Sequence, residues 1–385
     1  MPANNIFHFS HQAMATFFEV YIAGQDEAYS RSAAHAFFRE IDRLEKLLSR
    51  FDPGSEISMI NRLRPGESIP VGVETYECLK AGFELMVATS GAFNLNYRVI
   101  EKRKGGQESF EGNNVPAIKI SGAGYLAKKE EIRKPKMALK KNNKNENRLE
   151  EEAKVEQEEK EKPEEHSQSL FSEPRLMTIV LEEERKRLES KPGIIFNNFS
   201  EREIKFWQKL FPLELLEIQG GYLAVRLNVP EADLDLDLGA IGKGYALEKA
   251  AQIFADWEIS DFLVNAGQST VYARGEKPWP VAVGGGFDFF KGGKINLLNR
   301  ALSGSGHEVK GEHIFDPRQK EKKSRQLQAW ASHPSPTLAD GLTTAFMVMS
   351  LEEIAAYCEK HPEVWTLVLS RDKKSYQFNF PDICE

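Results

Sequence analysis

Apolar residues alternate or recur with helical spacing in several parts of the chain, and these stretches predict a mixture of strands and helices. Phe18, Val20 and Ile22 alternate with other residues between positions 14 and 23, which predicts a strand. Over residues 26–50 the apolar positions recur at steps of three and four, which predicts a helix with one buried stripe. That stripe comprises Ala33, Ala34, Phe37, Phe38, Ile41, Leu44, Leu47 and Leu48.

The pattern continues with a second amphipathic helix and then with a strand, turn, helix and strand unit. Residues 73–89 predict the helix, and Gly91 stands where a left-handed residue commonly ends one. Residues 222–227 and 234–238 alternate like strands, and the second run leads into a glycine-rich turn. A helix over 243–257 and an apolar strand over 262–264 are expected to follow.

A highly charged segment interrupts this pattern. Residues 127–165 contain 12 lysine or arginine and 12 glutamate residues but no aromatic residue, so too little apolar surface is available to offset the chain entropy. Positive charges dominate its first half and negative charges its second half, so the halves could pair as a helical hairpin or contact a partner. We therefore expect a disordered or loosely helical insert over 102–191, between two parts of one domain at 1–101 and 192–385.

Overall composition excludes several classes of protein. The net charge of -7 argues against nucleic acid as the main partner. No apolar run is long enough for a membrane span, and the first residues lack a secretory signal pattern, so a cytoplasmic location is expected. Cys78, Cys358 and Cys384 lie far apart without CxxC spacing, so neither a disulfide framework nor a zinc site is predicted.

The glycine-rich turn is the first segment with chemical potential. Residues 237–245 read Asp-Leu-Gly-Ala-Ile-Gly-Lys-Gly-Tyr, and glycines at the start of a helix let an anion approach the free amides, with Lys243 adding a positive charge. The spacing is neither that of a nucleotide triphosphatase loop nor that of the GxGxxG fingerprint. By itself the turn fits ligand binding and tight packing equally well.

Two further segments carry oxygen and nitrogen ligands. Asp340 and Thr344 lie four residues apart near the start of a helix, which suits a hard cation such as Mg²⁺. Alternatively, Asp340 stabilises the helix dipole in the first turn and Thr344 bonds back to the preceding turn. Ser303, His313 and Asp316 belong to a region that either binds phosphoryl oxygens or forms an ordinary polar turn.

Together these segments resemble one family, the FAD:protein FMN transferases of the ApbE family. The short matches occur in the family's order across most of the chain outside the charged segment. They comprise Met14–Thr16, Ser49–Ile57 with Asn61, Gly91–Phe93, Asp237–Tyr245, Val264–Gly267, His313–Arg318, and Ala339 and Asp340 with Thr344.

The resemblance implies a fold, an activity and a set of site residues. The fold would be α+β, with two sheet and helix halves and a flavin cleft between them. The activity would be Mg²⁺-dependent transfer of FMN from FAD to a threonine hydroxyl of an acceptor flavoprotein, with release of AMP. Its cofactor-binding residues would be Met14, Phe51, Ala92, Phe93, Asn94, Asp237, Lys243 and Ile314. Its metal ligands would be Ala240, Asp340 and Thr344, and its catalytic residues Lys243, His313 and Asp316, the last two as orienting groups or proton carriers.

The chain also departs from the family pattern. Asn94 and Asn96 replace an aspartate and a threonine, Gln268 replaces a glycine, and Leu302 replaces a threonine. Gln319 and Lys320 replace the Thr-Gly that follows the Asp-Pro pair. These changes leave the implied metal and pyrophosphate ligands intact. Two other functions therefore stay open, an FAD pyrophosphatase that releases FMN and AMP, and a flavin-binding protein without catalytic activity.

Overall fold

The predicted first helix is present in the computed structural model as α1 (Glu27–Leu48). The side chain of Asp26 caps it by accepting a hydrogen bond from the amide of Tyr29, and the apolar stripe is buried except for Leu47, which is partly buried. The structure describes residues 5–104, 200–218, 222–229, 233–267, 269–284, 287–306, 314, 316–319 and 324–383. The periodic apolar positions thus form the core-facing side of this helix.

A β-hairpin precedes α1, and only its second strand was predicted. β1 (Ile6–Ala13) and β2 (Thr16–Ala23) pair with Ala13 opposite Thr16, so Met14 and Ala15 alone form the turn. Both turn residues have positive φ, 48° and 56°. Two-residue hairpin turns favour this geometry because it matches the strand twist, although glycine or asparagine usually adopts it.

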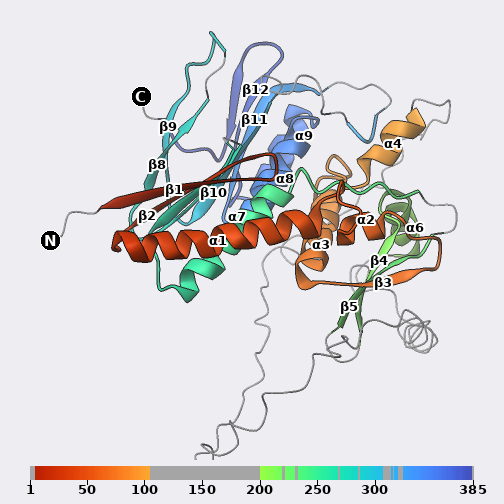
Figure 1. Cartoon of the computed structure of the whole chain (residues 1–385). Helices are drawn as coiled ribbons and strands as arrows, with labels where there is room; N and C mark the ends of the chain where they lie inside the picture. Colours follow the sequence, from red (N-terminus) through yellow and green to blue (C-terminus); the bar gives the residue numbers. More distant parts are fainter. Residues whose placement is uncertain are drawn as a thin grey trace, which may run out of the picture. The chain divides into compact units, whose positions relative to one another are not determined.

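An antiparallel eight-stranded sheet is the largest element of the fold. All its neighbouring strands run antiparallel, and β2 pairs with β6 although the two lie far apart in the sequence. Figure 1 labels β1, β2, β10, β11 and β12 of this sheet. In spatial order the strands are β1, β2, β6 (Phe262–Ala266), β7 (Thr270–Arg274), β10 (Arg300–Gly306), β11 (Gln326–His333), β12 (Trp365–Ser370) and β13 (Ser375–Phe378). With the helices described below, this sheet places the chain in the α+β class, as predicted.

The two faces of this sheet are covered by different elements. α1, α7 (Gly242–Asp256) and α8 (Pro336–Phe346) contact strands on one face and also contact one another in the pairs α1 with α7 and α7 with α8. A separate two-stranded sheet of β8 (Trp279–Val283) and β9 (Gly293–Leu297) contributes Val283, Ile295 and Leu297 to a second core with Ala273 and Leu302. α9 (Leu351–Lys360) begins with a Ser350 and Glu353 capping box.

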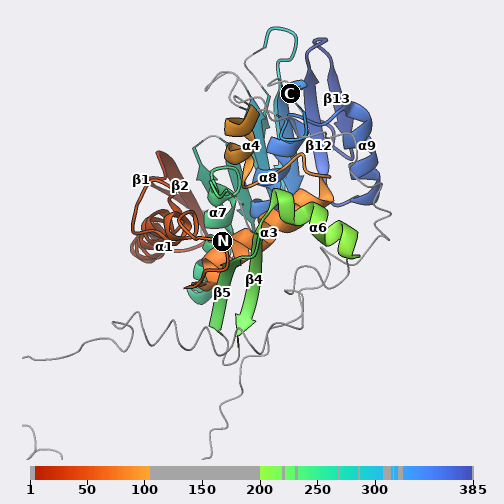
Figure 2. The same cartoon turned by 90° about the vertical axis from the view of Figure 1, so that its right-hand side faces the viewer.

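A three-stranded antiparallel sheet forms the other half of the fold. Its order is β3 (Ser68–Val71), β5 (Tyr222–Leu227) and β4 (Leu213–Ile218). The predicted second helix, α3 (Val73–Ala88), contacts both β5 and α8 and so links the two halves (Figure 2). Three shorter helices complete this part, α2 (Glu56–Ile60), α4 (Tyr97–Lys104) and α6 (Glu201–Leu210).

The predicted charged insert lies almost entirely outside the described residues. The described residues belong to one compact unit, although they lie on both sides of segment 121–191 in the chain. Helix α4 continues to Lys104, so described structure extends into the first residues of the expected insert. The domain boundaries at 1–101, 102–191 and 192–385, and the charged hairpin within the insert, stay predictions.

One glycine of the glycine-rich turn, Gly244, is needed for the packing of α7 against α8. A Cβ atom added to Gly244 would overlap the carbonyl oxygen of Pro336 and lie 2.9 Å from the Cβ atom of Asp340. Gly244 therefore lets the first turn of α7 press against the first two turns of α8. Nothing lies within 4 Å of a Cβ added at Gly242, so tight packing does not explain that glycine.

We predict that Gly244→Ala lowers the free energy of unfolding by about 1 to 3 kcal/mol, because overpacking forces the two helices apart. Gly242→Ala is the matched control on the same helical turn. It should be neutral or stabilising by up to about 1 kcal/mol, since alanine favours a helix over glycine. Urea unfolding of the two variants measures the difference, and equal stabilities would contradict the packing role of Gly244.

Candidate functional site

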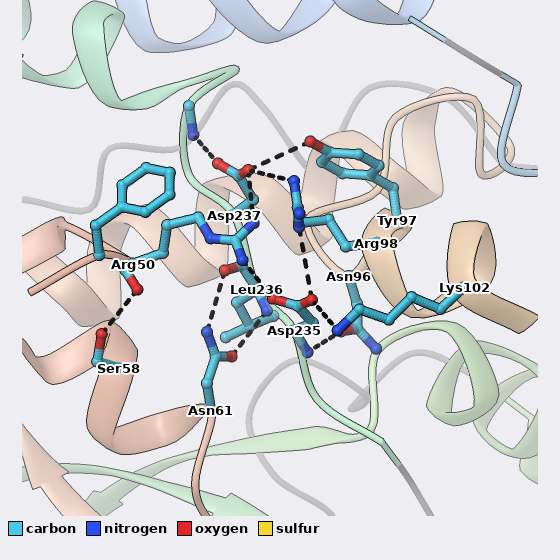
Figure 3. Close-up of polar contacts among 12 residues, drawn as sticks. Arg50, Ser58, Asn61, Asn96, Tyr97, Arg98, Lys102, Asp235, Leu236 and Asp237 are labelled. Atoms are coloured by element: carbon cyan, nitrogen blue, oxygen red, sulfur yellow. Dashed lines mark hydrogen bonds and ion pairs between the residues drawn. The ribbon is translucent and has the colours of Figure 1, made fainter. Parts of the chain in front are cut away.

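Residues 233–238 approach the glycine turn in an extended conformation but do not form the strand that alternation predicted. Two asparagine side chains form hydrogen bonds with the backbone of this segment, in place of those that a neighbouring strand would form (Figure 3). Asn61 accepts from the amide of Leu236 at 2.7 Å and donates to its carbonyl at 3.2 Å. Asn96 accepts from the amide of Asp235 at 2.9 Å and donates to the carbonyl of Asp233 at 3.2 Å.

Three cations surround the two carboxylates of this segment. Arg50 lies 3.0 Å from Asp235 and 3.3 Å from Asp237 between charged atoms. Arg98 lies 3.5 and 3.9 Å from the same two carboxylates, and Lys102 lies 2.8 Å from Asp235 (Figure 3). Burial raises the pKa of Asp235, but the Lys102 hydrogen bond and the charges of Arg50, Lys102 and Arg98 outweigh it, so the pKa is lowered overall.

Asp237 is fixed in place at the entrance of the turn. Its backbone amide donates to the carbonyl of Leu95 at 2.9 Å, and one carboxylate oxygen accepts from the amide of Gly239 at 2.9 Å. The other oxygen accepts from the Tyr97 hydroxyl at 3.2 Å. Burial first, and then the charge of Asp237, raises the pKa of Tyr97, so the hydroxyl stays protonated as a donor.

The N-terminus of α7 has no cap from its own sequence. Ile241 occupies the N-cap position and makes no side-chain hydrogen bond. The amide of Gly244 instead donates to Asp340 Oδ2 on α8 at 3.0 Å. Within the described part of the chain, the amides of Ala240 and Lys243 donate no hydrogen bond. Free amides at a helix N-terminus, where the dipole is positive, form a site for an anion.

Asp340 is a buried carboxylate that receives donors from three sides. Its Oδ1 atom lies 3.1 Å from the Thr270 hydroxyl and 3.3 Å from the Ser303 hydroxyl. Its Oδ2 atom accepts from Gly244, as above, and lies 3.6 Å from Lys243 Nζ. Lys243 also donates to the carbonyl of Gly239 at 3.2 Å. Hydrogen-bond donors and one cation therefore converge on both oxygens of the Asp340 carboxylate.

The structure differs from both purely local explanations of Asp340 and Thr344. α8 begins at Pro336 with Ser335 as its cap, so Asp340 is its fifth residue and does not lie in the first turn. Thr343 donates to the Asp340 carbonyl at 2.8 Å, the back-bond that the sequence assigned to Thr344. Thr344 is partly exposed, and its hydroxyl makes no hydrogen bond with any described residue.

The predicted metal ligands come from the turn before α7, which contains Ala240, and from α8, which contains Asp340 and Thr344. The carbonyl oxygen of Ala240 is the regular acceptor for the amide of Gly244, but that amide donates to Asp340, and no other described residue donates to this carbonyl. The carbonyl of Ala240, the hydroxyl of Thr344 and the carboxylate of Asp340 are all oxygen donors. This set fits a hard cation such as Mg²⁺, which prefers oxygen ligands and retains water or substrate oxygens.

Two predicted flavin-binding residues have conformations that suit a ligand contact. Phe51 exposes 84% of its surface, and the guanidinium of Arg50 lies over its ring at 5.2 Å from the centroid. An exposed ring of this kind can stack on a planar group. Met14 lies in the strained hairpin turn and is partly buried against the core. Backbone strain of this type concentrates at binding and catalytic sites.

The remaining predicted flavin-binding residues lie deeper in the protein. Ala92 and Phe93 are buried, so their side chains pack in the core and any ligand contact from them is through the backbone. Asn94 is also buried; its Oδ1 atom accepts from the amide of Asn96 at 2.7 Å, and its Nδ2 atom has no partner among described residues. Ile314 is partly buried against the main core.

Of the two remaining predicted catalytic residues, Asp316 is described by the structure and His313 is not. Asp316 is buried, and its two carboxylate oxygens accept from Arg318 at 2.9 and 3.0 Å, while Arg318 also donates to Glu353 at 2.8 Å. The two-point bond to arginine fixes the orientation of the Asp316 carboxylate, and its catalytic role stays a prediction. His313 lies outside the described residues, so its role stays a prediction.

Comparison with known proteins decides the family. A model of the ApbE family matches residues 14–158 and 183–368, which is most of the chain. The chain belongs to the ApbE family. A curated FAD:protein FMN transferase of Klebsiella pneumoniae (strain 342) is 29% identical over 149 residues. That match spans 35% of this chain and 42% of the relative, so it covers less than half of the curated protein.

Solved structures confirm the ApbE-like fold that the sequence motifs implied. The flavin transferase ApbE from Vibrio cholerae matches 99% of this chain and 100% of its own, with a TM-score of 0.63 and 17% identity. The flavinyl transferase ApbE from Pseudomonas stutzeri in its apo form matches 98% of both chains, with a TM-score of 0.61 and 16% identity. The ApbE protein from Thermotoga maritima matches 97% of both, with a TM-score of 0.60 and 20% identity.

Two features are absent from the described residues of this ApbE family member, a cluster of metal-binding side chains and a membrane-spanning helix. Among the described residues, no group of three or more His, Cys, Asp or Glu side chains is arranged to hold a metal ion. A search of the same residues finds no helix that is both long and apolar enough to cross a bilayer.

Sequence reasoning missed the residues that hold the ApbE motifs in position. Arg98 and Lys102 approach Asp235 from α4, more than 130 residues earlier in the chain, and no local spacing connects them. Thr270 was not singled out, and Ser303 was noted only as a small residue near the predicted phosphoryl site. Strand pairing sets both residues opposite each other, which a single sequence does not reveal.

The Lys102–Asp235 pair yields a pH-dependent prediction. A carboxyl whose pKa is lowered on folding stabilises the fold above its unfolded pKa, and this contribution is lost as pH falls through the folded pKa. Lys102→Met should therefore lower the free energy of unfolding at pH 7 by about 0.2 to 1 kcal/mol, since the lysine is 70% exposed and well solvated. The difference from wild type should shrink as the solution is acidified.

Urea unfolding across the acid range measures this effect. Lys205→Met is the control, because Lys205 is an exposed lysine on α6 with no ion pair to any described residue. A Lys102→Met deficit that stays constant down to acid pH would show that the ion pair with Asp235 is not its cause.

Proposed function

We propose that this chain transfers FMN from FAD to a threonine hydroxyl of an acceptor flavoprotein in a Mg²⁺-dependent reaction that releases AMP. The observation that carries the proposal is the meeting of Asp340 with the N-terminus of α7. The free amides of Ala240 and Lys243 and the Lys243 ammonium offer positive charge to a pyrophosphate, and the carboxylate beside them offers an anionic ligand to a cation. Membership of the ApbE family and the name of the Klebsiella pneumoniae relative support this chemistry.

The proposed reaction breaks one phosphoanhydride bond and forms one phosphoester bond. The threonine oxygen attacks the phosphorus of the FMN half, the bond to the AMP oxygen breaks, and the hydroxyl proton is released. A bound Mg²⁺ supplies charge neutralisation on the pyrophosphate oxygens. Asp340, Thr344 and the Ala240 carbonyl would hold it.

The residues of the chain contribute mainly binding and positioning. Lys243 and the amides of the glycine turn hold the pyrophosphate oxygens, and preorganised donors of this kind stabilise the charge that develops as the bond breaks. Phe51 offers its exposed ring as a stacking surface for a planar part of FAD. Asp237, fixed by Gly239 and Tyr97, offers a positioned carboxylate beside the turn.

Incubation of the full chain with FAD and Mg²⁺, with and without a flavoprotein acceptor domain, tests the proposal. Chromatography detects AMP and FMN, and mass spectrometry detects FMN attached to the acceptor. AMP together with a flavinylated threonine supports the transferase. AMP and free FMN without acceptor modification would identify a pyrophosphatase. Neither product at any Mg²⁺ concentration would leave a flavin-binding protein without catalytic activity.

Asp340→Asn should reduce AMP release by at least roughly 100-fold, because it removes the proposed carboxylate ligand of the cation while keeping the side-chain shape. Asparagine is preferable to alanine, since Asp340 is buried and its removal would leave the Gly244 amide and the Thr270 hydroxyl without an acceptor. Asp372→Asn in an exposed turn is the control. Full activity of Asp340→Asn would exclude the metal role.

Lys243→Met should lower kcat by roughly 100- to 1000-fold and change the Kd for FAD much less, because the ammonium acts mainly on charge that develops in the transition state. Lys249→Met is the matched control on the same helix, where Lys249 pairs with Glu77 at 3.0 Å. Turnover is measured by AMP release and the Kd by flavin fluorescence. A raised Kd for FAD with an unchanged kcat would instead assign Lys243 to ground-state binding.

A further inference from the structure

Two hydroxyl groups from neighbouring strands contact the Asp340 carboxylate from the sheet side. Thr270 at the start of β7 pairs directly with Ser303 on β10, and both side chains face α8. Their hydroxyl oxygens lie 2.9 Å apart. Both residues are fully buried, on the same face of the sheet as the apolar core residues Tyr272 and Ala301.

Counting protons shows that the two hydroxyls are not equivalent. Ser303 has one proton and lies closer to the carbonyl of Ser269, at 3.0 Å, than to Asp340 Oδ1, at 3.3 Å. Thr270 lies 3.1 Å from the same carboxylate oxygen. When Ser303 donates to Ser269, Thr270 is the hydroxyl that donates to Asp340. Thr270 therefore provides the principal sheet-side hydrogen bond to the carboxylate.

The carboxylate is thus held from two opposite elements. The Gly244 amide of α7 fixes Oδ2, and Thr270 of β7 fixes Oδ1. A carboxylate held in this way has one orientation and loses little rotational freedom when it binds a cation. Residues that hydrogen-bond a metal ligand commonly set metal affinity in this manner.

We propose that Thr270 is a positioning residue for the Asp340 carboxylate, with Ser303 in a supporting role, and that it sets the affinity of this site for a divalent cation. The inference rests on the proposed function, because it assigns the carboxylate to cation binding. Thr270 itself contacts neither substrate nor cation. Its effect passes through the orientation of Asp340.

Titration of the full chain with Mn²⁺ alone, with free Mn²⁺ measured by electron paramagnetic resonance, provides a readout independent of activity. Thr270→Val should weaken Mn²⁺ binding roughly 10- to 100-fold, and Thr270→Ser should restore most of it because the hydroxyl returns. Ser303→Ala should have a smaller effect than Thr270→Val. Thr366→Val is the matched control, because Thr366 is a buried threonine of the same sheet whose hydroxyl lies 3.4 Å from Cys358 Sγ, away from Asp340.

Each outcome decides the proposal. Equal Mn²⁺ affinity of Thr270→Val and wild type overturns the positioning role while leaving the proposed function untouched. No Mn²⁺ binding by the wild type removes the cation site itself, and this inference with it. Thr270→Ala replaces the valine variant if that variant does not fold. If neither folds although Thr366→Val does, the hydroxyl serves the fold and the positioning role is wrong.

Discussion

The contact between the Gly244 amide and the Asp340 carboxylate is the interaction on which the rest of the site depends. It requires a residue without a side chain at the start of α7, because α8 passes too close for a Cβ atom. In return, α7 receives from α8 the cap that its own sequence lacks. One hydrogen bond therefore joins two helices and also brings a carboxylate to the positive end of a helix dipole.

This contact explains the unusual state of the neighbouring groups. Because Gly244 donates to a side chain, the carbonyl of Ala240 loses its regular helical donor and accepts no hydrogen bond from any described residue. Burying Asp340 would be unfavourable without compensation, and Lys243 together with the donors on its two oxygens supplies that compensation. Of the two interpretations of the glycine turn, packing explains Gly244, and ligand binding by the remaining residues of the turn stays a prediction.

The helices and strands that could be predicted from the sequence are those that depend on local periodicity and on motif order. The helices over 26–50, 73–89 and 243–257 and the strands at 222–227 and 262–264 are confirmed, because their apolar spacing reflects burial directly. The strand at 234–238 was wrong, since alternation indicates an extended chain but not what bonds to it, and here Asn61 and Asn96 do so. The partners of Asp340 and Asp235 could not be found, because long-range strand pairing and the docking of α4 place them there.

The strand order of the large sheet has a consequence for the synthesis of the chain. The hairpin of β1 and β2 emerges first, yet β2 pairs with β6, whose residues are made more than 200 positions later. Contacts of such long sequence separation form slowly. Bringing the two strands together closes a long loop, and the entropy lost in closing it is not offset until the contact is made. The proposed cation ligands Asp340 and Thr344 are made after every described strand except β12 and β13. A nascent chain therefore exposes its early strands well before the proposed site can form.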